Sequence, residues 1–169
     1  MAGKLVQVAT NTVTSAVASV TLTGIDSDDV YMIAVNNVAP TTDGGTPIFR
    51  VTKSGTAQTD SEYDYAVKQL RTDTTFGNNA EVNIDSFKTN DIGTNTGEVL
   101  NMILYLYNFN SSSEYSFITQ EISQRSSSGL LRGRQGGAVH TVASASDGME
   151  FKIGSGNIAS GTFTLYKVI

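Results

Sequence analysis

The stretch EVLNMILYLYNFNSSSEYSFITQEIS (Glu98–Ser123) decides between a helical and a β-sheet fold. Its first half, Glu98–Phe109, is the most apolar segment of the chain, and leucine and methionine are also good helix formers. The segment has no polar stripe at helical spacing, and its NSSS turn leads directly into a second alternating segment, Glu114–Ser123. We therefore predict two antiparallel strands. The two faces expected for the first strand are both apolar: Val99, Ile103, Tyr105 and Tyr107 on one, Leu100, Met102, Leu104 and Leu106 on the other.

Similar segments recur along the chain with turn residues between them. Only 16% of the residues are charged, and serine, threonine, asparagine and glycine are abundant, which suits strands and turns better than helices. We expect turns at Ser126–Gly129 and at Gly136-Gly137, with short strands around them. The other expected strands are Lys4–Ala9, Ala16–Ile25, Val30–Val38, Ile48–Lys53, Glu62–Leu70, 149–153 and 161–169.

This pattern predicts an all-β fold, an antiparallel β-sandwich of jelly-roll type with about ten short strands. At 169 residues, the chain is expected to form a single domain spanning residues 1–169. Residues 71–97 are polar and weakly patterned. They form either a long excursion with a short strand near Ala80–Phe87 or an interaction loop.

Charge and composition limit the expected partners. The net charge of −5 gives no electrostatic reason to bind nucleic acid or anionic lipid. No apolar run approaches the length of about 18 residues that a membrane span needs, and no signal peptide is predicted. The chain has no cysteine, which excludes disulfides and thiol chemistry and fits folding in a reducing cytosol.

A single histidine and a group of aspartates raise the question of a catalytic or metal site. His140 is the only histidine, so a catalytic triad or metalloenzyme would have to use it, and no accompanying motif is present. We expect a hydrogen-bonded or solvent-facing strand histidine. Asp26, Asp28 and Asp29, with Asp43, offer oxygen ligands, but the spacing is not that of an EF-hand. A turn stabilised by its own aspartates is favoured, and no metal or cofactor is predicted.

The remaining charged groups are weaker candidates. Asp60, Glu62 and Asp64 alternate along one expected strand and fit a solvated face better than an acid–base pair. Three arginines come close together near the end of the chain, and we interpret them as pairing across a subunit contact rather than as a phosphate site. These are Arg125, Arg132 and Arg134.

Exposed tyrosines can stack on sugar rings or anchor an interface, although buried sheet packing explains them equally well. The candidates are Tyr105, Tyr107, Tyr115 and Tyr166. Near the C-terminus, Gly154, Gly156 and Gly161 do not match a phosphate-binding motif, and a strand rather than a helix follows them. They predict a corner before the last strand.

Two segments carry a resemblance to a known family. LTGIDSDDVYMIAVNNVAPTTDGGTPIFRV (Leu22–Val51) and DGMEFKIGSGNIASGTFTLYKVI (Asp147–Ile169) resemble the two ends of small virion structural proteins of tailed bacteriophages, notably marine and cyanobacterial ones. The shared features are a GI-D…Y corner, an apolar strand, a Pro-Thr/Asp-Gly loop and a GN-ASGT-LYG ending. Lys167 stands where the family tends to have glycine.

The resemblance implies a non-enzymatic tail-fibre, tail-appendage or head-decoration protein, made in the bacterial host cytoplasm and built into the virion. We expect a homo-oligomer, a homotrimer by first choice, in contact with other virion proteins. The second apolar face of Val30–Val38 and Val99–Tyr107 would then lie against a second sheet or subunit. A module that reads host-surface glycan is the second hypothesis, and a glycan depolymerase with paired carboxylates is the third.

Overall fold

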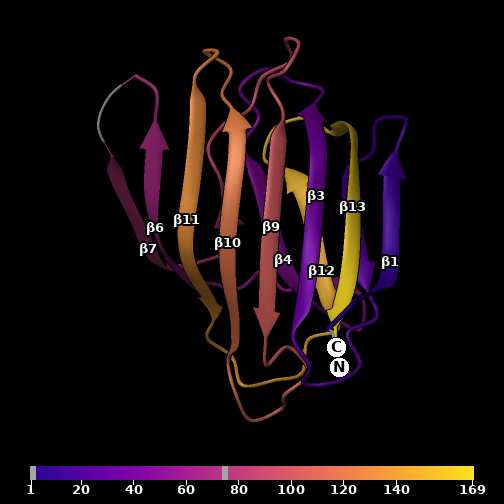
Figure 1. Ribbon diagram of the computed structural model, residues 1–169. Helices are drawn as coiled ribbons and strands as arrows, with labels where there is room; N and C mark the ends of the chain where they lie inside the picture. The colour runs from indigo at the N-terminus through magenta and orange to yellow at the C-terminus, as the bar shows by residue number, and fades with distance from the viewer. Residues whose placement is uncertain (1–2, 74–75) are drawn as a thin grey trace.

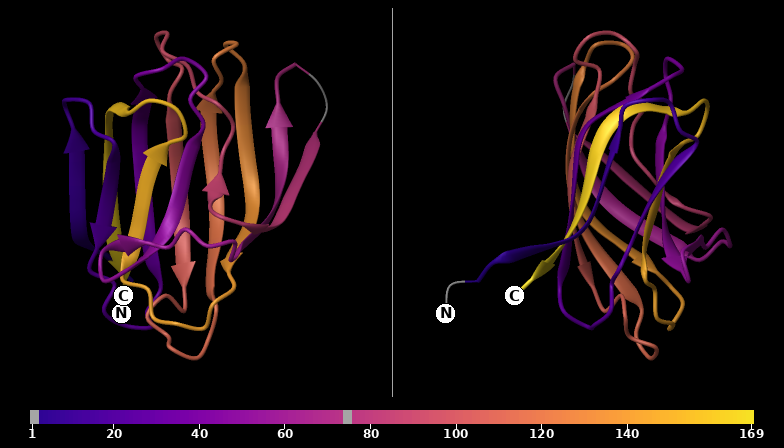
Figure 2. Two further views of the ribbon diagram at one scale, coloured as in Figure 1. Left: turned by 180° about the vertical axis from the view of Figure 1, so that it is seen from behind. Right: turned by 90° about the vertical axis from the view of Figure 1, so that its right-hand side faces the viewer.

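A computed structural model describes residues 3–73 and 76–169, which form two antiparallel sheets packed face to face (Figures 1 and 2). The large sheet has eight strands, in the spatial order β1 (Leu5–Val13), β13 (Ile158–Val168), β3 (Tyr31–Pro40), β9 (Leu100–Tyr107), β10 (Ser116–Arg125), β11 (Leu131–His140), β6 (Tyr63–Arg71) and β7 (Gly77–Ile84). The small sheet has β2 (Ser19–Thr23), β12 (Gly148–Ile153), β4 (Pro47–Lys53) and β5 (Thr56–Ala57), and β8 (Phe87–Lys88) also pairs with β4. The predicted all-β sandwich is confirmed.

The strand order contains a jelly roll. Eight strands form the jelly roll: β1, β2, β3, β4, β8, β9, β12 and β13. Numbered 1 to 8 by their place in this list, they lie in the order 1-8-3-6 in the large sheet and 2-7-4-5 in the small one, which is the arrangement of two interleaved Greek keys. Among the described residues there is no helix, and so none long and apolar enough to cross a membrane.

Two hairpins extend the large sheet beyond the jelly roll. β10–β11 follows β9, and β6–β7 adds the last two strands, so that half of the large sheet lies outside the jelly-roll core. The polar stretch 71–97 contains strand structure near the predicted Ala80–Phe87. It supplies β7 and β8, and its segment 89–92 folds back over the extended sheet through hydrogen bonds from Gln69 and Gln124 to Asn90. Residues 74–75 of this stretch lie outside the described residues.

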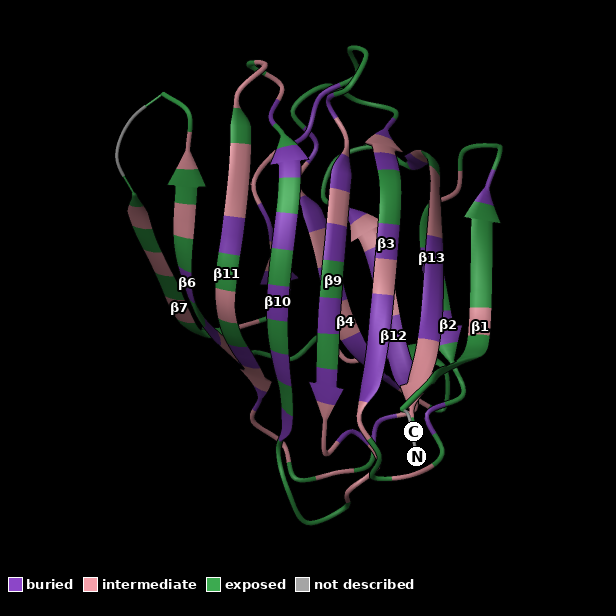
Figure 3. Cartoon of the chain, viewed as in Figure 1, coloured by how far each residue is buried: buried purple, intermediate pink, exposed green. Residues whose placement is uncertain are grey.

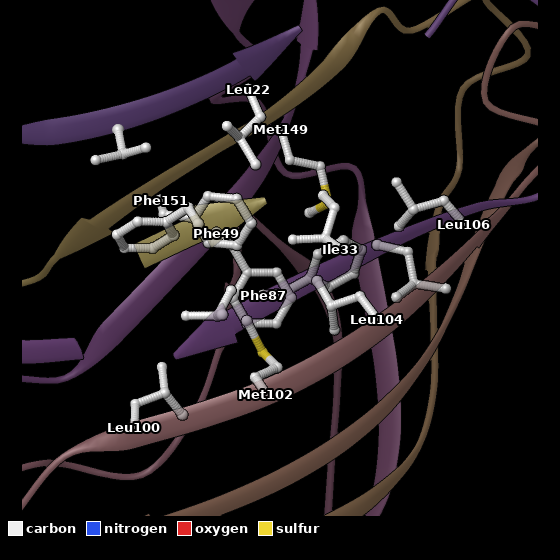
Figure 4. Close-up of a cluster of buried hydrophobic side chains, with 14 of the residues drawn as sticks. Leu22, Ile33, Phe49, Phe87, Leu100, Met102, Leu104, Leu106, Met149 and Phe151 are labelled. Atoms are coloured by element: carbon white, nitrogen blue, oxygen red, sulfur yellow. The ribbon is translucent and has the colours of Figure 1, made fainter. Parts of the chain in front are cut away.

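The core lies between the two sheets and follows from strict alternation. In β9, Leu100, Met102, Leu104 and Leu106 are buried while the residues between them are not, as the banding of Figure 3 shows. Phe49, Phe87 and Phe151 pack beside this leucine face from the opposite sheet (Figure 4). Only one of the two apolar faces predicted for Glu98–Phe109 is thus used inside the chain.

Two turn predictions have different outcomes. The turn at Ser126–Gly129 is confirmed, because the amide of Gly129 donates to the carbonyl of Ser126 within the β10–β11 connection. The turn at Gly136-Gly137 is wrong, since both residues lie inside the ten-residue strand β11. A Cβ at Gly136 would lie 2.3 Å from the carbonyl oxygen of Ala66, so the glycine permits a close approach of β6 rather than a turn.

Candidate interaction surface

The face of the large sheet that points away from the small sheet has no covering layer within the described chain. We call it the outer face; it is turned towards the viewer in Figures 1 and 3. Its large apolar side chains are freely accessible, with exposed fractions from 37% to 66%. Contiguous exposed apolar surface marks interaction sites, and one hollow on this face has a continuous apolar lining. The members are Leu5, Leu70, Val82, Ile103, Tyr105, Phe117 and Leu131.

One part of the outer face is hollowed. Its floor consists of small side chains on four neighbouring strands, Ala80, Ala66, Gly137 and Thr119, which stand side by side in register. Val82, Val139 and Phe117 form one wall, and the hollow has a volume of about 530 Å³ with an almost wholly apolar lining. We call it the apolar hollow. Such a lining suits apolar side chains of a partner.

The candidate tyrosines gather on the outer face beside the hollow. Tyr105 and Tyr107 point outward from β9, Tyr166 has the same orientation on β13, and Tyr115 is 45% exposed just before β10. Phe117, directly opposite Tyr107, completes the set. Sequence alone left these residues undecided between core and surface, and the structure assigns them to the surface.

The acidic turn at Asp26, Asp28 and Asp29 is closed by a lysine from the far end of the chain. Lys167 Nζ lies 2.8 Å from Asp29 Oδ2 and 3.7 Å from Asp26 Oδ1, and it also donates to the hydroxyl of Ser27 at 2.8 Å. The hydrogen bond from Lys167 lowers the pKa of Asp29, and the one from the hydroxyl of Tyr31 lowers the pKa of Asp26. The ammonium group therefore pairs with the carboxylates of both Asp26 and Asp29.

Asp43 lies elsewhere, where its carboxylate accepts from the amide of Thr94. In the part of the chain that the structure describes, no group of three or more His, Cys, Asp or Glu side chains is arranged to hold a metal ion.

His140 is buried between the sheets rather than solvent-facing. It is 0% exposed, the ring of Tyr63 lies 4.9 Å from it, and Nε2 is 3.4 Å from Glu62 Oε2. Burial lowers the pKa of His140, and the charge of Lys53 lowers it further, while Glu62 opposes both. The imidazole is therefore neutral near pH 7, and neither of its nitrogens has a hydrogen-bond partner in the structure.

Acid should destabilise the protein through His140. Because its pKa is lowered in the folded state, the unfolded chain binds a proton first as pH falls below about 6.5, and stability is lost with a slope of at most about 1.4 kcal/mol per pH unit. Urea unfolding at pH 7.5 and 5.5 measures this loss. His140→Gln should make the loss smaller, and an unchanged pH dependence in this variant would exclude His140 as its origin.

The carboxylates Asp60, Glu62 and Asp64 are not gathered into one site. Asp60 is exposed before the strand, Glu62 lies beside His140, and Asp64 points to the outer face, where it accepts from the amide of Asn83 at 2.7 Å. This arrangement matches a partly solvated strand edge better than an acid–base pair.

The three arginines also separate. Arg125 is exposed and donates from Nε to the carbonyl of Gly129, while Arg134 is only 1% exposed and donates to the carbonyl of Lys88. The prediction that they pair across a subunit contact is wrong for Arg134, whose guanidinium stacks inside the sandwich, 5.3 Å from the ring of Tyr65. Burial lowers the pKa of Arg134.

Arg134 belongs to a buried polar layer that the sequence did not reveal. Gln120 and Gln124 point inward from β10, 3% and 2% exposed, under the covering segment 89–92. The alternation of β10 was visible, but polar side chains on the inner face carry no signal that distinguishes them from solvent-facing ones. In this layer Gln124 donates to the carbonyls of Asn90 and Asp91, and Arg134 donates to that of Lys88. The side-chain oxygens of Gln120 and Gln124 have no hydrogen-bond partner in the structure.

The closing glycines are structural. Gly154 and Gly156 lie in the turn between β12 and β13, and Gly156 has the positive φ of 84° that such a turn requires. Gly161 lies inside β13 at a register shift next to Val38, not in the corner itself. The corner prediction holds for the first two residues and is wrong for the third.

Comparisons of the chain with protein-family models, curated protein sequences and solved structures found no match. The outer face, with its apolar hollow and tyrosines, is the feature on which a functional proposal rests.

Proposed function

We propose that the chain is a non-enzymatic structural protein of a bacteriophage virion, a component of a tail fibre or tail appendage that assembles as a homo-oligomer. The observation that carries this proposal is the outer face. Seven large apolar side chains stand exposed there, two of which, Val82 and Phe117, line an apolar hollow, and a partner that covers them would remove this surface from water. Assembly provides such a partner.

The fold and the resemblance support the same proposal. Jelly rolls are common in viral capsid proteins. The two segments that resemble the phage family, 22–51 and 147–169, lie together, since β3 pairs with β13 while β2 and β4 flank β12. The Asp29–Lys167 ion pair joins them at one end. The resemblance therefore involves residues that form one structural unit.

Electron cryomicroscopy of virions from the phage whose genome carries this sequence tests the proposal. A map should contain repeated copies of a sandwich with one eight-stranded sheet, at a fixed position on the tail. Copies spread over the head would instead support the alternative of a capsid-decoration protein. Purified virions that lack the chain by mass spectrometry would contradict both.

A receptor-binding module is a second candidate, favoured by the exposed rings of Tyr105, Tyr115 and Phe117, because aromatic rings stack on sugars. Binding of the purified protein to host cells or a glycan array, reduced by Tyr105→Ala, would support it. A flat array together with no cell binding would leave the architectural role.

A further inference from the structure

In one row across the outer face, one half of the sheet carries large side chains and the other half carries small ones. The strand registers align eight outward residues in one row across the whole sheet, which we call the central row. The row residues on β1, β13, β3 and β9 have large side chains, and those on β10, β11, β6 and β7 have small ones. In spatial order the row is Gln7, Tyr166, Met32, Tyr105, Thr119, Gly137, Ala66 and Ala80.

We propose that the outer face packs against the outer face of a second copy of this chain, about a two-fold axis that runs parallel to the strands between β9 and β10. This inference rests on the proposed function, in which copies of the chain assemble, and it specifies the surface through which two copies meet. The axis divides the eight strands four and four, so each strand of one half faces a strand of the other half. Sheets that pack face to face keep their strands nearly aligned, as this axis requires.

The axis brings large side chains over small ones. Met32 faces Gly137 of the second copy, Tyr166 faces Ala66, and Gln7 faces Ala80. Tyr166 on β13, which is half-buried, thus lies over the apolar hollow of the other copy, together with Met32 on β3, which is 8% exposed. Because the contact is isologous, both hollows are filled by the same operation.

The adjoining row reinforces the pairing. Tyr107 on β9 and Phe117 on β10 are direct neighbours on either side of the axis, so each ring meets the other residue's ring in the second copy. Leu5, 49% exposed in the same row on β1, would face the strand that carries Val82. Aromatic pairs of this kind add stability beyond the area that they bury.

The charges and the area of the outer face are compatible with a stable dimer. In the next row Lys68 and Glu121 have opposite signs, and the axis places them over Thr164 and Ile103, so no like charges meet. Eight strands at a spacing of about 4.8 Å, paired over about seven residues of about 3.4 Å each, give a face of roughly 900 Å². This is close to the area of about 800 Å² that each partner contributes to a standard interface.

Mass photometry and light scattering of the purified protein at micromolar concentration test the inference. The wild type should have twice the chain mass of 17.9 kDa. Gly137→Arg should raise the dimer dissociation constant by about 100-fold or more, because each dimer would bury two unpaired arginines. Within one chain the change is tolerated, since the nearest atom to a Cβ at Gly137 is 3.9 Å away. Thr21→Arg, exposed on the small sheet, is the matched control and should remain dimeric.

A cross-link tests the axis independently. The chain has no cysteine, so Thr119→Cys provides a single thiol beside the axis, and a short bis-maleimide should join two chains. Thr21→Cys should give no such product. If Gly137→Arg fails to fold by circular dichroism, Ala66→Arg and the cross-link decide.

A wild type that is monomeric or trimeric at tens of micromolar overturns the inference. So does a dimer that persists in a folded Gly137→Arg variant. A trimer would instead match the homotrimer that the resemblance implies. A monomer would also contradict the homo-oligomer of the proposed function, whereas a trimer would leave that function intact. Whether the chain occurs in virions is decided separately, by the map of the particle.

Discussion

Phe49→Ala is expected to lower the free energy of unfolding by about 3–5 kcal/mol, the usual cost of removing a fully buried phenylalanine side chain. Phe49 is 1% exposed, and its ring centroid lies 5.5 Å from that of Phe87 and 6.2 Å from that of Phe151. These rings come from three neighbouring strands of the small sheet, and Phe151 continues the contact to Phe163 in the large sheet. The substitution therefore empties the centre of the contact between the layers.

Urea unfolding followed by circular dichroism, at one fixed protein concentration, measures this loss. The slope of free energy against urea should stay unchanged, because the variant unfolds from the same fold. Phe76→Ala is the matched control. Its ring is 67% exposed and contacts the ammonium of Lys68 at 5.2 Å, so we expect a change below about 1 kcal/mol. Equal losses in the two variants would contradict the described core.

The alternation of apolar residues was enough to predict a sandwich of two sheets, because a strand with one buried face repeats every two residues. Glu98–Phe109 shows this: β9 has Leu100, Met102, Leu104 and Leu106 inside, and these residues formed one of its two predicted faces. Which face would turn inward was not predictable, since both were apolar. The structure turns the aliphatic residues inward and leaves Tyr105 and Ile103 outside.

Pairings between distant parts of the chain explain where the sequence misled. Gly136-Gly137 has the composition of a turn, yet β10 and β6 flank it on both sides and hold it extended. Lys167 had no visible partner, because Asp29 lies on a loop at the other end of the chain. No local pattern contains such information.

The candidate surface was predictable only in part. The four tyrosines were recognised from their strands, and their parity within β9 placed Tyr105 and Tyr107 together. The apolar hollow was not predictable, because its floor combines small residues from β7, β6, β11 and β10. A stripe of small side chains across four strands appears only when the registers are known.

Gly148→Ala is expected to cost about 3 kcal/mol or more, although it adds a single methyl group. A Cβ at this position would lie 1.9 Å from the carbonyl oxygen of Leu22 and 2.9 Å from the Cα of Thr23. Both atoms belong to the backbone of β2, so no side chain can move aside. β2 would have to separate from β12, and the amides of Gly24 and Ile25 would lose their hydrogen bonds to the carbonyl of Asp147.

Gly77→Ala is the matched control for this prediction, since both glycines lie within strands of the sandwich and Gly77 is not in the proposed contact between copies. Its Cβ would meet nothing closer than 3.5 Å, and alanine in a strand is favoured over glycine by about 0.5–1 kcal/mol. Urea midpoints should therefore fall steeply for Gly148→Ala and stay level or rise for Gly77→Ala. If both variants matched the wild type, β2 would not lie as close to β12 as the structure places it. The opposite signs expected for one methyl group reflect the neighbouring backbone alone, because the chemical change is identical.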